Sequence, residues 1–201
     1  MRIYRLGDKY LKIEDDMSPE SPRYWDNLGK MVCWHNRYNL GDKHDFSEPN
    51  DFIKETENVD MVCLRLYLYD HSGISISTRS FNGRAQHANW DSMQVGYIYV
   101  TYEDIKKEYN VTEITDEIID KVTDVLKGEV ETYDKYLTGD IYGFTILHFD
   151  KCDKCGHTEE VIEESCWGFY GSDPEKNGIF DSIAKEWRSS EEIDESVFRA
   201  I

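Results

Sequence analysis

The residues best suited to chemistry lie in the segment Cys152-Asp153-Lys154-Cys155-Gly156-His157. Two thiolates at C-x-x-C spacing can bind one ion through a tight turn, and Gly156 permits the backbone conformation of such a turn. Tetrahedral zinc needs two more ligands, and Cys166 and His157 are the nearest candidates in the sequence. The spacing therefore predicts a structural zinc knuckle at residues 150–171. A plain hairpin tip with idle thiols and a redox-active pair are the alternatives.

Cys33 and His35 form a second candidate pair, two residues apart and on the same side of an extended chain. A nucleophile and its base must lie within hydrogen-bond reach, and a third group usually orients the base. The sequence does not identify that third group. Catalysis by Cys33 and His35 is therefore an alternative to a buried cysteine beside a half-exposed histidine.

The loop at residues 79–90 is locally basic, since it contains Arg79, Arg84 and His87. Loops of about twelve residues between strands often carry function. We expect Arg79 and Arg84 to receive a phosphate or an acidic partner, with an ordinary surface loop as the alternative. In an enzymatic hypothesis, this loop converges with Cys33 and His35 on a pocket for a nucleotide or nucleic acid.

Negative charge dominates the composition, with a formal net of −18, and it is unevenly distributed. Residues 1–102 carry 12 basic and 15 acidic side chains, a net of −3, whereas residues 103–201 carry 11 and 26, a net of −15. Such a half repels nucleic acid, because affinity for a duplex comes from cations that neutralise phosphates. It would attract a basic groove on another protein. The alternative is a solvated helical face that keeps the protein soluble.

The clearest predicted element is a helix at residues 115–137, whose apolar residues recur every three or four positions. Thr115 is its predicted N-cap and Gly139 its end. Acidic residues lie off the apolar stripe, and we expect four of them to bind a basic partner: Asp120, Asp124, Glu131 and Asp134.

Three β-rich runs, at residues 62–69, 74–78 and 95–102, predict an antiparallel meander. A further strand is predicted at residues 141–149, pairing with residues 159–163 across the cysteine turn, and a last helix at residues 179–187. Residues 165–171 are expected to form a tight turn. The fold class is therefore α+β: one mainly antiparallel sheet, formed by the meander and the strand at 141–149, packed against the long amphipathic helix, with a C-terminal helix.

The length of 201 residues predicts a single domain, with an acidic C-terminal tail at residues 189–201. No apolar run approaches twenty residues, and no apolar segment follows the N-terminal methionine, so we expect neither a membrane span nor a secretion signal. Five cysteines without a dense framework of paired spacings indicate reduced thiols in the cytoplasm.

Three segments carry a resemblance to a known group of proteins: residues 28–35 (LGKMVCWH), 90–100 (WDSMQVGYIYV) and 165–171 (SCWGFYG). Each resembles segments of short, acidic, uncharacterised proteins of phages and other mobile elements. The resemblance implies an intracellular protein of a mobile element, a setting in which acidic anti-defence proteins inhibit host nucleases.

The resemblance and the charge together predict a non-enzymatic protein that binds and inhibits a basic, nucleic-acid-binding host protein. A defence nuclease such as a CRISPR effector or a restriction enzyme is the expected target, which would make the chain an anti-CRISPR or antirestriction protein. No direct binding of nucleic acid is expected. A small zinc-containing enzyme that acts on a nucleotide or nucleic acid is the alternative.

Overall fold

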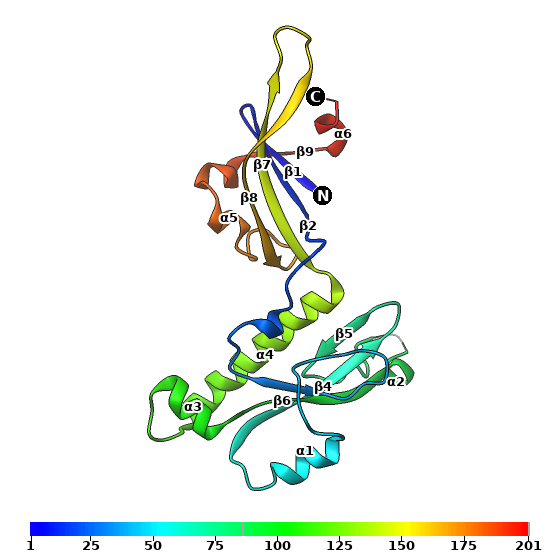
Figure 1. The fold of residues 1–201 in the computed structure, drawn as a ribbon, viewed down its shortest axis with the longest axis vertical. Coiled ribbons are helices and arrows are strands. Elements are labelled where there is room, and N and C mark those ends of the chain that lie inside the picture. The colour runs from blue at the N-terminus through cyan, green and yellow to red at the C-terminus, as the bar shows by residue number, and fades with distance from the viewer. Residues whose placement is uncertain (86, 201) are drawn as a thin grey trace. The chain divides into compact units, whose positions relative to one another are not determined.

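The computed structural model describes residues 1–85 and 87–200 and confirms the α+β class, with two antiparallel sheets (Figure 1). Its contacts divide the chain into two compact units where the sequence predicted one domain. Unit 1 comprises Met1–Glu20 and Gly139–Ile201, and unit 2 comprises Ser21–Thr138. Among the helices of the described residues, none combines the length and the apolar composition that a bilayer crossing requires.

Unit 2 is built on a four-stranded sheet in the order β3-β6-β4-β5. The expected meander is wrong in its order, because β6 pairs with the edge of β4 opposite β5. The strands are β3 (Lys30–Cys33), β4 (Met61–Asp70), β5 (Ile74–Ser77) and β6 (Ser92–Thr101). The helices are η1 (Pro22–Tyr24), α1 (Pro49–Glu55), α2 (Ala88–Asp91), α3 (Tyr102–Tyr109) and α4 (Asp116–Thr138), where η denotes a 3-10 helix.

The long helix α4 confirms the predicted amphipathic helix and packs its apolar stripe on the sheet of unit 2 (Figure 1). Val122, Leu126 and Val130 are almost fully buried among Leu66 and Ile98 of the central strands. Burial of such side chains stabilises a fold by about 1.5–3 kcal/mol each. The core of unit 2 therefore lies between this helix and one face of the sheet.

Unit 1 contains the second sheet, in the order β8-β7-β2-β1-β9. Its strands are β1 (Arg2–Leu6), β2 (Lys9–Asp15), β7 (Ile141–Lys151), β8 (Thr158–Tyr170) and β9 (Glu191–Ile193). Its helices are α5 (Ile179–Ser182), η2 (Lys185–Ser189) and α6 (Glu195–Phe198). Alternation along β2 and β7 sends Leu11 and Phe144 to a core with α5, and Tyr10 and Leu147 to a core with α6.

Four expectations are corrected in unit 1. The strand predicted at 141–149 is β7, but it pairs with β2 and β8 and does not join the sheet covered by α4. Residues 165–171 do not form a tight turn, because β8 continues through Tyr170. The helix predicted at 179–187 is divided into α5 and η2. Of the acidic segment predicted at 189–201, the described residues 189–200 are held to the unit and do not form a tail, since β9 pairs with β1 and Phe198 is buried; residue 201 lies outside the described residues.

We predict that Gly96→Ala destabilises unit 2 by about 2 kcal/mol, as overpacking does elsewhere. A Cβ at Gly96 would lie 2.0 Å from the backbone oxygen of Val32, so β3 and β6 could not keep their pairing distance. The matched control is Gly128→Ala in α4, where a Cβ meets nothing within 4 Å. The control should stabilise the protein by roughly 1 kcal/mol through helix propensity. Thermal unfolding measures both, and equal midpoints for the two variants would contradict the packing argument.

Candidate partner-binding site

Arg23 organises the part of unit 2 that borders the candidate site. Its side chain is only 5% exposed and binds Asp42 in a bidentate manner, with Nε donating to Oδ1 at 2.9 Å and Nη2 to Oδ2 at 2.7 Å. Nη1 donates to Oε2 of Glu129 on α4 at 3.2 Å. Burial acts to lower the pKa of Arg23, but the hydrogen bonds and charges of Asp42 and Glu129 outweigh it and raise that pKa.

The two carboxylates in turn hold the chain that leads into β3. Oε1 of Glu129 accepts the backbone N–H groups of Leu28 at 2.8 Å and Gly29 at 3.2 Å. Oδ2 of Asp42 accepts the N–H of Met31 at 2.7 Å. A buried charged network of this kind fixes segments that are distant in sequence, because any movement would leave an unpaired charge.

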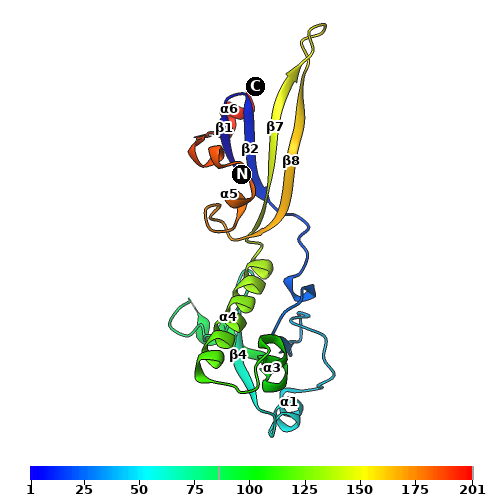
Figure 2. The same ribbon diagram turned by 90° about the vertical axis from the view of Figure 1, so that its left-hand side faces the viewer.

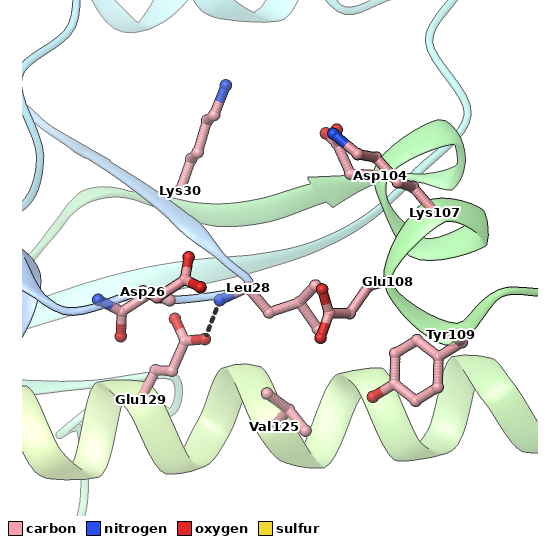
Figure 3. Close-up of a pocket in the computed structure, with 10 residues that line it drawn as sticks. Asp26, Leu28, Lys30, Asp104, Lys107, Glu108, Tyr109, Val125 and Glu129 are labelled. Carbon is pink, nitrogen blue, oxygen red and sulfur yellow. Dashed lines mark hydrogen bonds between the residues drawn. The ribbon is translucent and has the colours of Figure 1, made fainter.

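A hollow of about 490 Å³ lies beside this network, between the segment that precedes β3 and the helices α3 and α4 (Figure 3). Figure 3 shows Glu129 reaching the N–H of Leu28, with Glu108 and Tyr109 of α3 opposite Val125 of α4. Four carboxylates and two lysines contribute to its lining. The lining residues are Asp26, Asn27, Leu28, Lys30, Asp104, Lys107, Glu108, Tyr109, Val125 and Glu129.

This acidic hollow, meaning the cavity of Figure 3, has the chemistry to receive a cationic side chain. Glu129 is already paired with Arg23, but the other three carboxylates of the lining still outnumber its two lysines, and Val125 is 40% exposed. Tyr24, 80% exposed, and Trp25, 46% exposed, come directly before Asp26 in the chain. Exposed aromatic rings beside carboxylates favour arginine, which pairs with both. Sequence reasoning missed this site, because its residues come from three separate segments.

The acidic residues predicted on α4 divide into two groups. Asp120, Asp124 and Glu131 are exposed, as a partner-binding role requires. Asp134 is instead part of the fold, since its Oδ1 accepts the N–H of Ile76 at 2.7 Å and the hydroxyl of Ser75 at 2.8 Å. It connects α4 to β5, so reversing its charge would destabilise unit 2.

Arg79 and Arg84 line a separate hollow of about 270 Å³ beside α4. Lys127 adds a third cation, but Glu131 and Asp134 line the same hollow. The guanidinium of Arg84 lies 5.5 Å from the ring centroid of Phe81, a cation–π distance. The two arginines line one hollow, but the carboxylates beside them reduce the attraction for phosphate.

The geometry does not favour Cys33 as a nucleophile. Burial, followed by the charge of Asp42, raises the pKa of the Cys33 thiol to about 12, so the thiolate is scarce at neutral pH. Nδ1 of His35 accepts the backbone N–H groups of Arg37 and Tyr38 at 3.2 Å, and its ring stacks on Tyr38. Both residues stabilise the local structure, which leaves the enzymatic alternative without an activated group here.

The cysteines predicted to bind zinc lie in unit 1, and the structure does not bring all of them together. Cys152 and Cys155 lie in the exposed turn between β7 and β8. Cys166 follows Thr158, the first residue of β8, by eight positions, which is roughly 25 Å along an extended strand. Within residues 1–85 and 87–200, no three His, Cys, Asp or Glu side chains are grouped so that they could hold a metal ion.

Comparison of the chain with protein-family models, with curated proteins and with solved structures found no match in any of the three. The geometry and charge of the chain itself therefore carry the functional argument.

We predict that Arg23→Met destabilises unit 2 by about 3 kcal/mol, because it leaves the carboxylates of Asp42 and Glu129 without their cation. The matched control is Arg37→Met, which removes an ion pair with Asp70 from a side chain that is 69% exposed. Such a surface pair contributes less than about 1 kcal/mol. Urea unfolding of both variants measures the difference. Equal losses would show that the buried network does not stabilise the fold.

We also predict the order in which the thiols react in the native protein. Cys152 should be alkylated by iodoacetamide first, because hydrogen bonds from the backbone N–H groups of Cys155 and Lys154 lower its pKa. Cys33 should be last, since a pKa of about 12 leaves on the order of one thiol in 10⁴ ionised at pH 8. Timed alkylation and peptide mass spectrometry measure the order, with the guanidinium-unfolded chain as control. Alkylation of native Cys33 as fast as exposed Cys166 would refute the assignment.

Proposed function

We propose that this chain is an acidic interaction protein of a mobile element that binds a basic, nucleic-acid-binding host protein and inhibits it. A defence nuclease, such as a CRISPR effector or a restriction enzyme, is the target class that the resemblance to mobile-element proteins indicates. The observation that carries the proposal is the exposed acidic surface of unit 2, formed by α4 and the acidic hollow beside it.

The charge of unit 2 supports this proposal independently of unit 1. Residues 21–138 hold 13 basic and 21 acidic side chains, a net of −8. Several of the basic side chains are already neutralised within the unit, Arg23 by two carboxylates and Lys121 and Lys127 by neighbours on α4. The exposed carboxylates Asp120 and Glu131 contribute to an outward negative potential, whereas the charge of Asp124 is already paired with Lys127.

The negative potential of unit 2 attracts any basic surface, and the acidic hollow offers a specific contact for one cationic side chain of the partner. Val125 and Glu129 of α4 line the hollow, and Asp120, Asp124 and Glu131 are exposed elsewhere on the same helix. A lysine or arginine that normally binds phosphate could enter the hollow between Asp26 and Glu108. Buried contacts of this type determine affinity, whereas the surrounding charges mainly raise the association rate.

Inhibition follows from competition for the same cations. A groove that binds DNA or RNA uses lysines and arginines to neutralise phosphates. When these side chains pair with the carboxylates of this chain, they are no longer available to the nucleic acid. Association should weaken as salt rises, because exposed charges are screened over about 8 Å at physiological ionic strength.

We predict that the combined variant Asp120→Lys, Asp124→Lys and Glu131→Lys slows association with the partner roughly tenfold at low salt while the protein stays folded. Asp134 is left unchanged because of its bonds to β5. The matched control reverses three exposed acids near the end of α1, Glu55, Glu57 and Asp60, and changes the net charge equally.

The measurement has two stages. Affinity capture from a host lysate at low and high salt first identifies a retained nucleic-acid-binding protein, and surface plasmon resonance then compares the variants on that partner. Displacement of labelled DNA or RNA from the partner by the wild-type chain tests inhibition directly. The proposal fails if no nucleic-acid-binding protein is retained, if the partner keeps its nucleic acid, or if the control slows association as much as the α4 variant.

A further inference from the structure

The turn between β7 and β8 lies at the end of a projecting two-stranded hairpin. β2 pairs with β7 only as far as His148, whereas β7 and β8 remain paired up to Lys151 and Thr158 (Figure 2). Residues 151–157 are all exposed. The two cysteines of the turn are thus displayed beyond the part of the sheet in which three or more strands pair.

The backbone of this turn has the form of a metal-binding knuckle. The N–H of Gly156 donates to the carbonyl of Cys152, and the N–H of Cys152 donates to the carbonyl of His157, both at 2.8 Å. Gly156 has φ of 70°, a conformation that glycine adopts without strain. A tight turn of this form lets two thiolates at C-x-x-C spacing bind one ion.

The knuckle supplies only half of a tetrahedral thiolate site. Cys166 is roughly 25 Å away along β8 and cannot complete it. In the part of the chain that the structure describes, no third His, Cys, Asp or Glu side chain joins the two cysteines as a possible metal ligand. A closed structural zinc site has four ligands, so such a site at this turn would need two ligands from another molecule.

We propose that two copies of this chain bind one Zn²⁺ between their hairpin tips, with Cys152 and Cys155 of each copy as the four ligands. A second copy is the simplest source of the missing ligands, because it presents the same pair of thiols on the same projecting turn. Zinc has the matching preference, since it binds four cysteine thiolates tetrahedrally. Each thiol releases its proton to the solvent when it binds, so affinity falls as pH falls.

The charge of the hairpin tip allows two copies to approach each other there, although the whole chain is strongly acidic. Asp150 and Asp153 are balanced at the tip by Lys151 and Lys154. Zinc with four thiolates carries two negative charges, and the balanced aspartates and lysines of the two tips add no further net charge. The two tips can therefore meet without the repulsion that a net charge of −18 produces elsewhere.

The experiment adds zinc chloride to the reduced, untagged full-length chain. We expect about half an equivalent of tightly bound zinc per chain and a doubling of the mass in sedimentation equilibrium, reversed by EDTA. Substitution with Co²⁺ should give the absorption bands of a tetrahedral site with four sulfur ligands. The site lies in unit 1, so this test is independent of the partner-binding surface on unit 2.

Two variants separate the proposed site from other thiols. Cys152→Ser with Cys155→Ser should abolish both zinc binding and dimer formation, whereas the control Cys166→Ser should leave both unchanged. One zinc per chain with an unchanged mass would overturn the proposal in favour of a site within one molecule. Absence of zinc binding, or loss of binding in Cys166→Ser, would also overturn it. Circular dichroism of each variant confirms that the fold is retained.

Discussion

Unit 2 depends most on the ion pairs that the buried guanidinium of Arg23 makes with Asp42 and Glu129. The guanidinium joins the segment after η1, the loop that carries Asp42 and the helix α4 through one charged network. Each carboxylate that pairs with it also accepts backbone N–H groups near the start of β3. A charge this deeply buried must be fully paired, so the three segments can only adopt positions that pair it. The acidic hollow lies beside this network because Glu129 belongs to both.

The carboxylates of α4 also divide into those that the fold uses as hydrogen-bond acceptors and those exposed to solvent. Glu129 and Asp134 face the unit and are occupied by hydrogen bonds, whereas Asp120, Asp124 and Glu131 point to solvent. A count of acidic residues therefore overstates the surface that a partner can reach. Helical periodicity places the first group along the sheet and the loops, and the second away from them. The proposed interaction depends on this division more than on the total charge.

The two units offer different chemistry. Unit 2 provides carboxylates on a helix and an acidic hollow, which suit a basic protein surface. Unit 1 provides two exposed thiols on a hairpin tip, which suit a soft metal ion. Burial raises the pKa of the Cys33 thiol, whereas hydrogen bonds from backbone N–H groups lower the pKa of the exposed Cys152 thiol.

Local pattern in the sequence determined the elements themselves: the apolar stripe of α4, its cap by Thr115, and the strands β4, β5, β6 and β7. These depend on periodicity and on side chain-to-backbone bonds between near neighbours. Only the tertiary structure decided which strands share a sheet, that Asp134 is committed to β5, and that Cys166 is remote from Cys152. Strand order, buried ion pairs and β8's extended length depend on contacts between distant segments, and a single sequence does not encode those as a local pattern.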